Sequence, residues 1–247
     1  MAERTFETCD GWGYDNIVLN VPRGTKINFL EVNMTKLVDL TLTAYTDEVR
    51  GEKPAPGGGS VSAYAAALGA SLTQMVGSLT IDKKPFEGLT DDEKALMREN
   101  QKKLDGIIDE LNDIVDTDAN SFDDVMAAFK LPKDTDEEKK KRSEAIQLGY
   151  KKALETPIHA AKLGLEAMKL QSIYANKGNK NAITDVGVGT LLLQSGIEGA
   201  LFNALINLNS VKDEAYVAQK RAEVDEIMKE GKDLKEKTLA IVYSKLQ

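Results

Sequence analysis

Residues 104–129 read LDGIIDELNDIVDTDANSFDDVMAAF, and this segment decides the fold. Reading it in alternating steps of four and three residues gives a series that is apolar except at one position. The series is Leu104, Ile108, Leu111, Val115, Asp118, Phe122, Val125 and Phe129. This spacing predicts an α-helix whose apolar stripe faces a core or a neighbouring helix. Asp118 alone places a carboxyl group on that stripe.

A charged carboxyl on a buried seam costs several kcal/mol if it has no partner. Asp118 is therefore either a structural residue that finds donors on a neighbouring helix, or a carboxyl with a raised pKa that can give up a proton near neutral pH. The stripe alone favours the structural interpretation. The other acids of the segment fall off the stripe and are expected to be solvated: Asp109, Asp113, Asp116, Asp123 and Asp124.

The composition favours packed helices over a β-sandwich. The chain has 247 residues, of which 42% are hydrophobic but only 6% aromatic, so the core must be built from Ala, Leu, Ile and Val. The length suits one large domain or two small ones. The net charge is −8, with basic and acidic residues interspersed, which argues against nucleic acid as a ligand.

Cysteine and histidine are nearly absent. The single Cys9 excludes an internal disulfide and fits a reducing, cytoplasmic compartment. With one cysteine and one histidine, His159, a zinc site of the Cys/His type cannot be assembled. The first thirty residues show no secretory signal. Any catalysis is expected to use carboxylates, lysines, hydroxyls, amides or the backbone.

The chain divides into an irregular N-terminal extension, residues 1–33, and a helical domain, residues 34–247. Thr90 with Glu93, and Thr135 with Glu138, each form a capping-box pattern that opens a helix. The expected fold is an all-α, single-domain bundle of about six to seven helices. The expected helices cover about residues 37–49, 61–79, 90–131, 135–156, 157–176, 184–207 and 210–245.

The stretch 61–79 carries no charge and approaches the length of a membrane-spanning helix. It also contains five Ser, Thr and Gln side chains, and alanine is its most frequent apolar residue. Its small residues would let another helix approach closely. We therefore expect a buried central helix and no membrane contact.

A Pro-Gly loop, PAPGGGS at residues 54–60, precedes this helix. Its glycines free the backbone to approach a ligand, and Ser60 could cap the helix. The N–H groups at the helix start suit a carboxylate or phosphate. A tight turn between helices is an equally good interpretation. The loop is neither a P-loop nor a nucleophile elbow.

Several motifs, in order, resemble one known family. They are PAPGGGSV at 54–61, MV at 75–76 with LTI at 79–81, VDTDA at 115–119 reaching Phe122, LPK at 131–133, GN at 178–179, ITDVGV at 183–188 and FNALINL at 202–208. The set resembles the formiminotetrahydrofolate cyclodeaminase and methenyltetrahydrofolate cyclohydrolase family over residues 34–247. Residues 1–33 lie outside the resemblance.

The resemblance implies an all-helical homodimer that handles one-carbon units on tetrahydrofolate, with the folate itself as substrate and no other cofactor or metal. The second aspartate of the Val-Asp-x-Asp-Ala motif is the proton donor in the family, and here it is Asp118. The apolar stripe and the family motif thus both single out Asp118, so a catalytic role is now preferred over a structural one.

The same resemblance suggests residues that bind the substrate. It places the loop Gly57, Gly58, Gly59 and Ser60 at the folate. Lys83 and Lys84 either meet a polyglutamate tail or are a solvated pair. Asn203 and Asn207 lie on one helix face and either grip the pterin or bind backbone. Asn179 and Asp185 are placed near the substrate by resemblance alone. His159 is not expected to be catalytic.

Three functions stay open at this point. The first is a cyclodeaminase that makes 5,10-methenyltetrahydrofolate and ammonia from 5-formiminotetrahydrofolate, and it is favoured because Asp116 and Asp118 are both present. The second is a cyclohydrolase that interconverts the methenyl and 10-formyl forms. The third is a helical folate-binding module without turnover. Since 33 residues cannot form the transferase domain of bifunctional relatives, substrate is expected from solution or from a separate formiminotransferase.

Overall fold

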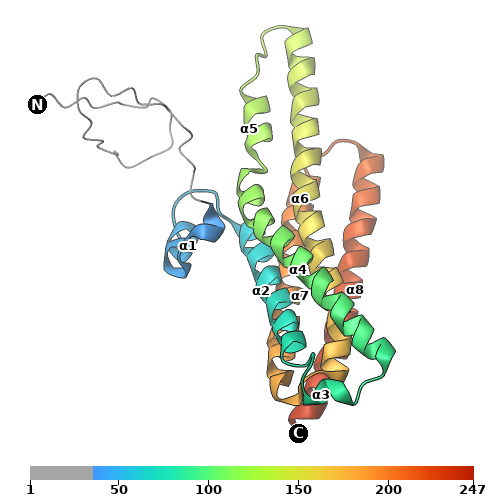
Figure 1. Ribbon diagram of the computed structural model, residues 1–247. Helices are drawn as coiled ribbons and strands as arrows, with labels where there is room; N and C mark the ends of the chain where they lie inside the picture. Colours follow the sequence, from blue (N-terminus) through green and yellow to red (C-terminus); the bar gives the residue numbers. More distant parts are fainter. Residues whose placement is uncertain (1–35) are drawn as a thin grey trace, which may run out of the picture. The chain divides into compact units, whose positions relative to one another are not determined.

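A computed structural model describes residues 36–247 (Figure 1); Cys9 and Trp12 lie outside the described residues, as does the predicted extension 1–33. The described part is built from helices and contains no β-strand, so the all-α prediction is confirmed. The elements are η1 (Leu37–Asp39), α1 (Leu42–Val49), α2 (Gly58–Ser78), α3 (Lys84–Glu87), α4 (Asp91–Asn120), α5 (Asp123–Phe129), α6 (Asp136–Lys177), η2 (Lys180–Ala182), α7 (Ile183–Leu208) and α8 (Glu214–Leu246).

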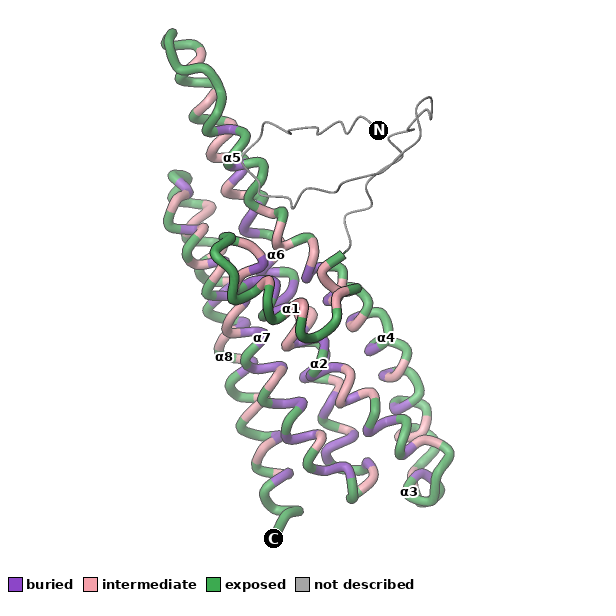
Figure 2. Tube along the Cα trace, turned by 90° about the vertical axis from the view of Figure 1, so that its left-hand side faces the viewer, coloured by how far each residue is buried: buried purple, intermediate pink, exposed green. Residues whose placement is uncertain are grey.

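Helix α2 packs against α4, α6 and α7 and lies between α4 and α7 in Figure 2. Much of it is buried, as the uncharged stretch predicts, but one side is exposed at Val61, Leu68 and Met75. Four of its five alanines are buried, and its glycines let neighbouring helices approach closely. At Gly69 a Cβ atom would lie 2.7 Å from the Gly189 carbonyl oxygen of α7. Contacts of Gly58 with Asn203 and of Gly69 with Gly189 show that α2 and α7 are antiparallel.

Both predicted capping boxes are present. The Thr90 hydroxyl accepts from the Glu93 N–H while the Glu93 carboxylate accepts from the Thr90 N–H, and Thr135 and Glu138 repeat the arrangement at α6. Each box satisfies two N–H groups that a helix start leaves without partners. The local pattern therefore fixed the first residue of two of the longest helices.

The predicted break at Pro157 is wrong, because α6 runs through it from Asp136 to Lys177. A proline inside a helix costs about 3 kcal/mol through a lost hydrogen bond and a clash. Here Pro157 is buried together with its neighbours Leu154, Ile158 and Ala161. We attribute the continuous helix to that packing, which offsets the local cost.

The long helix predicted to continue to residue 131 ends earlier. Helix α4 stops at Asn120 and α5 begins at Asp123. The Ser121 hydroxyl donates to the Asp118 carbonyl oxygen at 2.8 Å, which gives that carbonyl a partner outside the helix ladder. Beyond the break Phe122 and Phe129 are exposed. The stripe is buried at Val115, half-buried at Asp118 and buried again at Val125. Asp118 thus occupies the last turn of α4.

Helix α7 is the most apolar of the long helices. Within the described residues, Lys180–Leu208 is long and apolar enough by composition to cross a membrane. In the bundle it packs against α2, α6 and α8 (Figure 1). A buried core helix passes the same test, and its buried side chains, such as Leu193, Ile197 and Leu201, belong to the core.

Candidate active site

The last turn of α4 brings Asp118 against the first turn of α2. A Cβ atom built on Gly59 would lie 2.5 Å from Cγ of Asp118, well inside ordinary contact distance. The carboxyl group therefore occupies the space that any side chain at residue 59 would need. This contact explains why the loop must carry glycine here, and it places the predicted proton donor on the predicted folate loop.

Two opposing effects act on the Asp118 carboxyl. Burial raises its pKa above the ordinary value, because the charged form loses water, while the Ser60 backbone N–H at the start of α2 lowers it. Burial is the larger effect, so the pKa is raised. A larger fraction of this carboxyl carries its proton near neutral pH than for an ordinary aspartate, which suits a group that must donate a proton.

Ser60 does not cap α2 as predicted. The N-cap is Gly57, which has no side chain, and Ser60 lies inside the first turn and is fully buried. Its hydroxyl donates to the Val115 carbonyl oxygen at 2.8 Å, which ties the start of α2 to the last turns of α4. Ser60 therefore fixes the position of the glycine loop relative to the part of α4 that carries Asp118.

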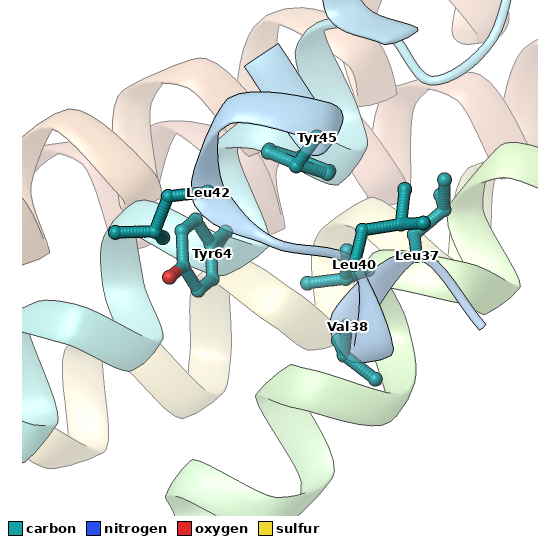
Figure 3. A pocket seen from close by; sticks show the side chains of 7 residues that line it. Leu37, Val38, Leu40, Leu42, Tyr45 and Tyr64 are labelled. Carbon is teal, nitrogen blue, oxygen red and sulfur yellow. The ribbon is translucent and has the colours of Figure 1, made fainter. Parts of the chain in front are cut away.

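Tyr45 of α1 reaches the same place, although no sequence pattern singles it out. Its hydroxyl lies 3.2 Å from the Ser60 hydroxyl, and burial raises its pKa. The rings of Tyr45 and Tyr64 meet edge to face, with centroids 5.5 Å apart, beside an apolar pocket (Figure 3). The pocket is lined by Leu37, Val38, Leu40, Leu42, Tyr45, Tyr64 and Val115.

Asp116 was predicted to be solvated, and that prediction is wrong. Its Oδ1 atom accepts from the Leu37 N–H at 2.6 Å, and its Oδ2 atom is buried without a hydrogen-bond partner among the described residues. The stripe could not reveal this role, because the partner is a backbone group 79 residues away in sequence. Asp116 fixes η1, which leads into α1 and Tyr45.

The two asparagines of α7 differ in their surroundings. Asn203 lies beside the glycine loop, since a Cβ atom on Gly58 would be 3.2 Å from its Nδ2 atom, and that nitrogen donates to the Gly199 carbonyl. Asn207 donates to the Ala153 carbonyl of α6 at 3.3 Å. Asn203 therefore shares the site with Asp118, whereas Asn207 joins α7 to α6.

The other predicted binding residues lie at the opposite end of α2. Lys83 and Lys84 are exposed and follow its C-terminus, and Asn179 donates to the Leu79 carbonyl and to the Thr80 hydroxyl there. Asp185 lies in the first turn of α7, at the same end. The 21 residues of α2 span roughly 30 Å at 1.5 Å per residue. Within one chain the structure does not bring this group to Asp118.

His159 lies outside both groups. Its Nε2 atom is 2.7 Å from a carboxylate oxygen of Glu110 on the exposed surface between α6 and α4. Within residues 36–247 no three Asp, Glu, His or Cys side chains come together in an arrangement that could hold a metal ion.

Comparison with known proteins gives a consistent result. Residues 41–226 match the family model described as formiminotransferase-cyclodeaminase. The methenyltetrahydrofolate cyclohydrolase of Methylorubrum extorquens is 34% identical over 206 residues, which cover 83% of this chain and 97% of that protein. The formimidoyltransferase-cyclodeaminase of Gallus gallus is 37% identical over 206 residues, again 83% of this chain. The chain spans only 37% of the length of that bifunctional relative.

A solved structure shares the fold. The formiminotetrahydrofolate cyclodeaminase of Thermotoga maritima superposes with a TM-score of 0.74 at 24% identity, covering 84% of this chain and 98% of that one. This likeness shows a shared helical fold.

Proposed function

The chain belongs to the formiminotransferase-cyclodeaminase family, and on that premise we propose that it cyclises 5-formiminotetrahydrofolate to 5,10-methenyltetrahydrofolate with release of ammonia. One observation carries the proposal. Asp118 of the Val-Asp-x-Asp-Ala motif is held against Gly59 in a setting that raises its pKa. A carboxyl whose pKa is raised by burial suits the proton donation that this reaction needs.

The reaction needs little more from the protein than position and a proton. The N10 nitrogen of the folate attacks the formimino carbon, so an N10–C bond forms, a five-membered ring closes and N10 loses its proton. The bond from that carbon to the former formimino nitrogen then breaks, and the nitrogen departs as ammonia once it is protonated. Because nucleophile and carbon already belong to one molecule, the protein's part in this step is to hold the reactive rotamer. Proton donation by Asp118 adds typically 10²–10⁴-fold.

The rest of the site suits a folate that carries the reacting group. The glycine loop lets the ligand approach the backbone at the start of α2, where N–H groups favour polar or anionic atoms. Asn203 adds an amide beside Gly58. The small apolar pocket lined by Tyr45 and Tyr64 adjoins the Ser60 contact and places two aromatic side chains next to the site.

A second candidate is the cyclohydrolase reaction, in which water opens the methenyl ring to the 10-formyl form. The observation in its favour is the Methylorubrum extorquens relative, which is named for that activity and matches this chain over 97% of its own length. The same Asp118 would serve there by exchanging a proton with the water-derived group. The two reactions differ in the atom that leaves, while the folate and the fold are shared.

A side-by-side assay separates these functions. Purified protein is given 5-formiminotetrahydrofolate, with ammonia measured by a coupled assay, and in parallel 5,10-methenyltetrahydrofolate, with loss of its near-ultraviolet absorbance followed. We expect ammonia release to exceed the uncatalysed rate by several orders of magnitude and to exceed hydration of the methenyl form. Faster hydration than ammonia release assigns the cyclohydrolase. Tight folate binding with neither change would support a non-catalytic binding module and contradict the proposal.

We expect a cytoplasmic enzyme that works as a homodimer, uses no metal, and receives formiminotetrahydrofolate, including polyglutamylated forms, from a separate formiminotransferase.

A further inference from the structure

The segment 37–49, which holds η1 and α1, packs on α4 and α2 (Figure 3), and we call it the η1–α1 strap. Neither element has a fully buried side chain, although Leu37, Val38 and Tyr45 pack against the edge of the core. A segment with so little buried apolar surface depends for its position on individual contacts. The partners in those contacts therefore indicate what the strap does.

The hydrogen bonds that join the strap to the other helices, among the described residues, both end beside Asp118. At one end of the strap the Leu37 N–H donates to Asp116, which lies two residues before Asp118 on α4. Further along, the Tyr45 hydroxyl lies 3.2 Å from the hydroxyl of Ser60. The backbone N–H of Ser60 is in turn the group that hydrogen-bonds to the Asp118 carboxyl. The strap is thus fixed to the two turns that hold this carboxyl.

Tyr45 is held at both its hydroxyl and its ring. The Ser60 hydroxyl has a single proton and donates it to the Val115 carbonyl oxygen at 2.8 Å, so the Tyr45 hydroxyl is the donor in its contact with Ser60. The ring meets that of Tyr64 edge to face (Figure 3). Tyr45 therefore has a fixed place over the first turn of α2, next to the contact between Ser60 and Asp118.

The protonation of Asp118 depends on how little water reaches it. Burial is the one effect that raises its pKa, and no charged side chain among residues 36–247 contributes to that shift. The ionisable groups around Tyr45 are Asp116 and Asp118 of α4 and Tyr64 of α2, and the charges of both carboxyls act on the Tyr45 hydroxyl. Tyr45 thus lies close to Asp118, and removal of its ring would admit water that favours the charged carboxylate.

We propose that Tyr45 is a positioning residue that covers the proton donor: its ring limits the water that reaches Asp118, and its hydroxyl anchors the η1–α1 strap to Ser60. Tyr45 itself transfers no proton. The inference rests on the proposed function for the role of Asp118 and on the contacts of the strap for its geometry. It assigns to a segment with no buried side chain the task of keeping the site dry.

The first test is the dependence of kcat on pH for ammonia release. Wild-type kcat should fall as pH rises through the pKa of Asp118, and in Tyr45→Ala this fall should move to lower pH, because water then reaches the carboxyl. Tyr45→Phe keeps the ring and should keep the wild-type profile. Val49→Ala, at the other end of α1, is the control and should also keep it. An unmoved profile in Tyr45→Ala overturns the proposal, and so does an equal shift in Tyr45→Phe.

The second test needs no turnover. Asp118→Asn is introduced into wild type and into Tyr45→Ala, and thermal unfolding is followed at neutral pH. A dry Asp118 destabilises the folded chain at a pH where it must lose its proton, so Asp118→Asn should raise the unfolding temperature of wild type. The increase should be smaller in Tyr45→Ala, where the carboxyl is already wet. Equal increases overturn the covering role.

Tyr45→Leu replaces Tyr45→Ala in both tests if the alanine variant does not fold. It keeps apolar bulk under the strap but has neither the ring nor the hydroxyl, so the same shift in the pH profile and the same smaller increase in unfolding temperature are expected. An unmoved profile or an equal increase overturns the proposal in this variant as well.

The two proposals fail in different ways. If wild-type protein turns over no folate, the proposed function fails, while thermal unfolding still tests whether Tyr45 covers Asp118. If turnover is present but neither the pH profile nor the unfolding temperatures respond to loss of the ring, the function stands and the covering role is wrong.

Discussion

Replacement of Gly59 by alanine probes the contact on which the site depends. The new Cβ atom would lie 2.5 Å from Cγ of Asp118, whereas ordinary contact begins at 3.4 Å, so the carboxyl must retreat by about 1 Å. A misplacement of that size can cost about 10²-fold in rate. We therefore expect kcat/KM for ammonia release from 5-formiminotetrahydrofolate to fall by about two orders of magnitude.

The free energy of unfolding of Gly59→Ala should fall only modestly. Overpacking costs about 1–3 kcal/mol, and the better helix propensity of alanine returns up to about 1 kcal/mol. Gly106→Ala on α4 is the control, because nothing lies within 4 Å of its added Cβ atom. The free energy of unfolding of Gly106→Ala, measured by thermal unfolding, should rise by about 1 kcal/mol, and its activity should stay that of wild type. If kcat/KM of Gly59→Ala lies within threefold of wild type, catalysis does not depend on the close contact between Asp118 and Gly59.

Four further outcomes follow from the structure. Because burial raises the pKa of Asp118, kcat should fall as pH rises through that folded-state pKa, and a profile rising in that direction would exclude a proton donor. For the same reason Asp118→Asn should unfold at a higher temperature than wild type at neutral pH, with the difference closing as pH falls to the ordinary value of 3.8. Tyr45→Phe should lower the free energy of unfolding by about 1 kcal/mol through loss of the Ser60 contact, as measured by urea titration. Gln171→Ala should cost about 3 kcal/mol, since Gln171 is fully buried and bonded to Thr73 and Thr190; a loss below 1 kcal/mol would contradict that role.

Local signals in the sequence were sufficient for much of the fold. The capping boxes at Thr90 and Thr135 place two helix starts because the interaction joins residues only three apart. The absence of charge in residues 61–79 predicts a helix that packs closely against its neighbours, and most of its alanines are buried against other helices. Pro157 misled the prediction, because the packing that offsets its cost comes from distant residues.

The site was predicted only in part, for a similar reason. Asp118 stands out because it is the one carboxyl on an otherwise apolar helix stripe, and the family motif selects the same residue. Asp116 and Tyr45 do not stand out, because their partners Leu37 and Ser60 meet them only in the folded chain. Lys83 follows the uncharged helix in sequence, and sequence order cannot show that the full length of α2 separates it from Asp118.

Asp118→Asn turnover, measured together with folate binding, tests the central claim most directly. The amide keeps the size of the side chain and removes the proton that the departing nitrogen needs. For Asp118→Asn we expect a folate affinity within a few-fold of wild type and a kcat for ammonia release lower by about 10²–10⁴-fold. Near-wild-type kcat in this variant would contradict the claim that Asp118 donates the proton.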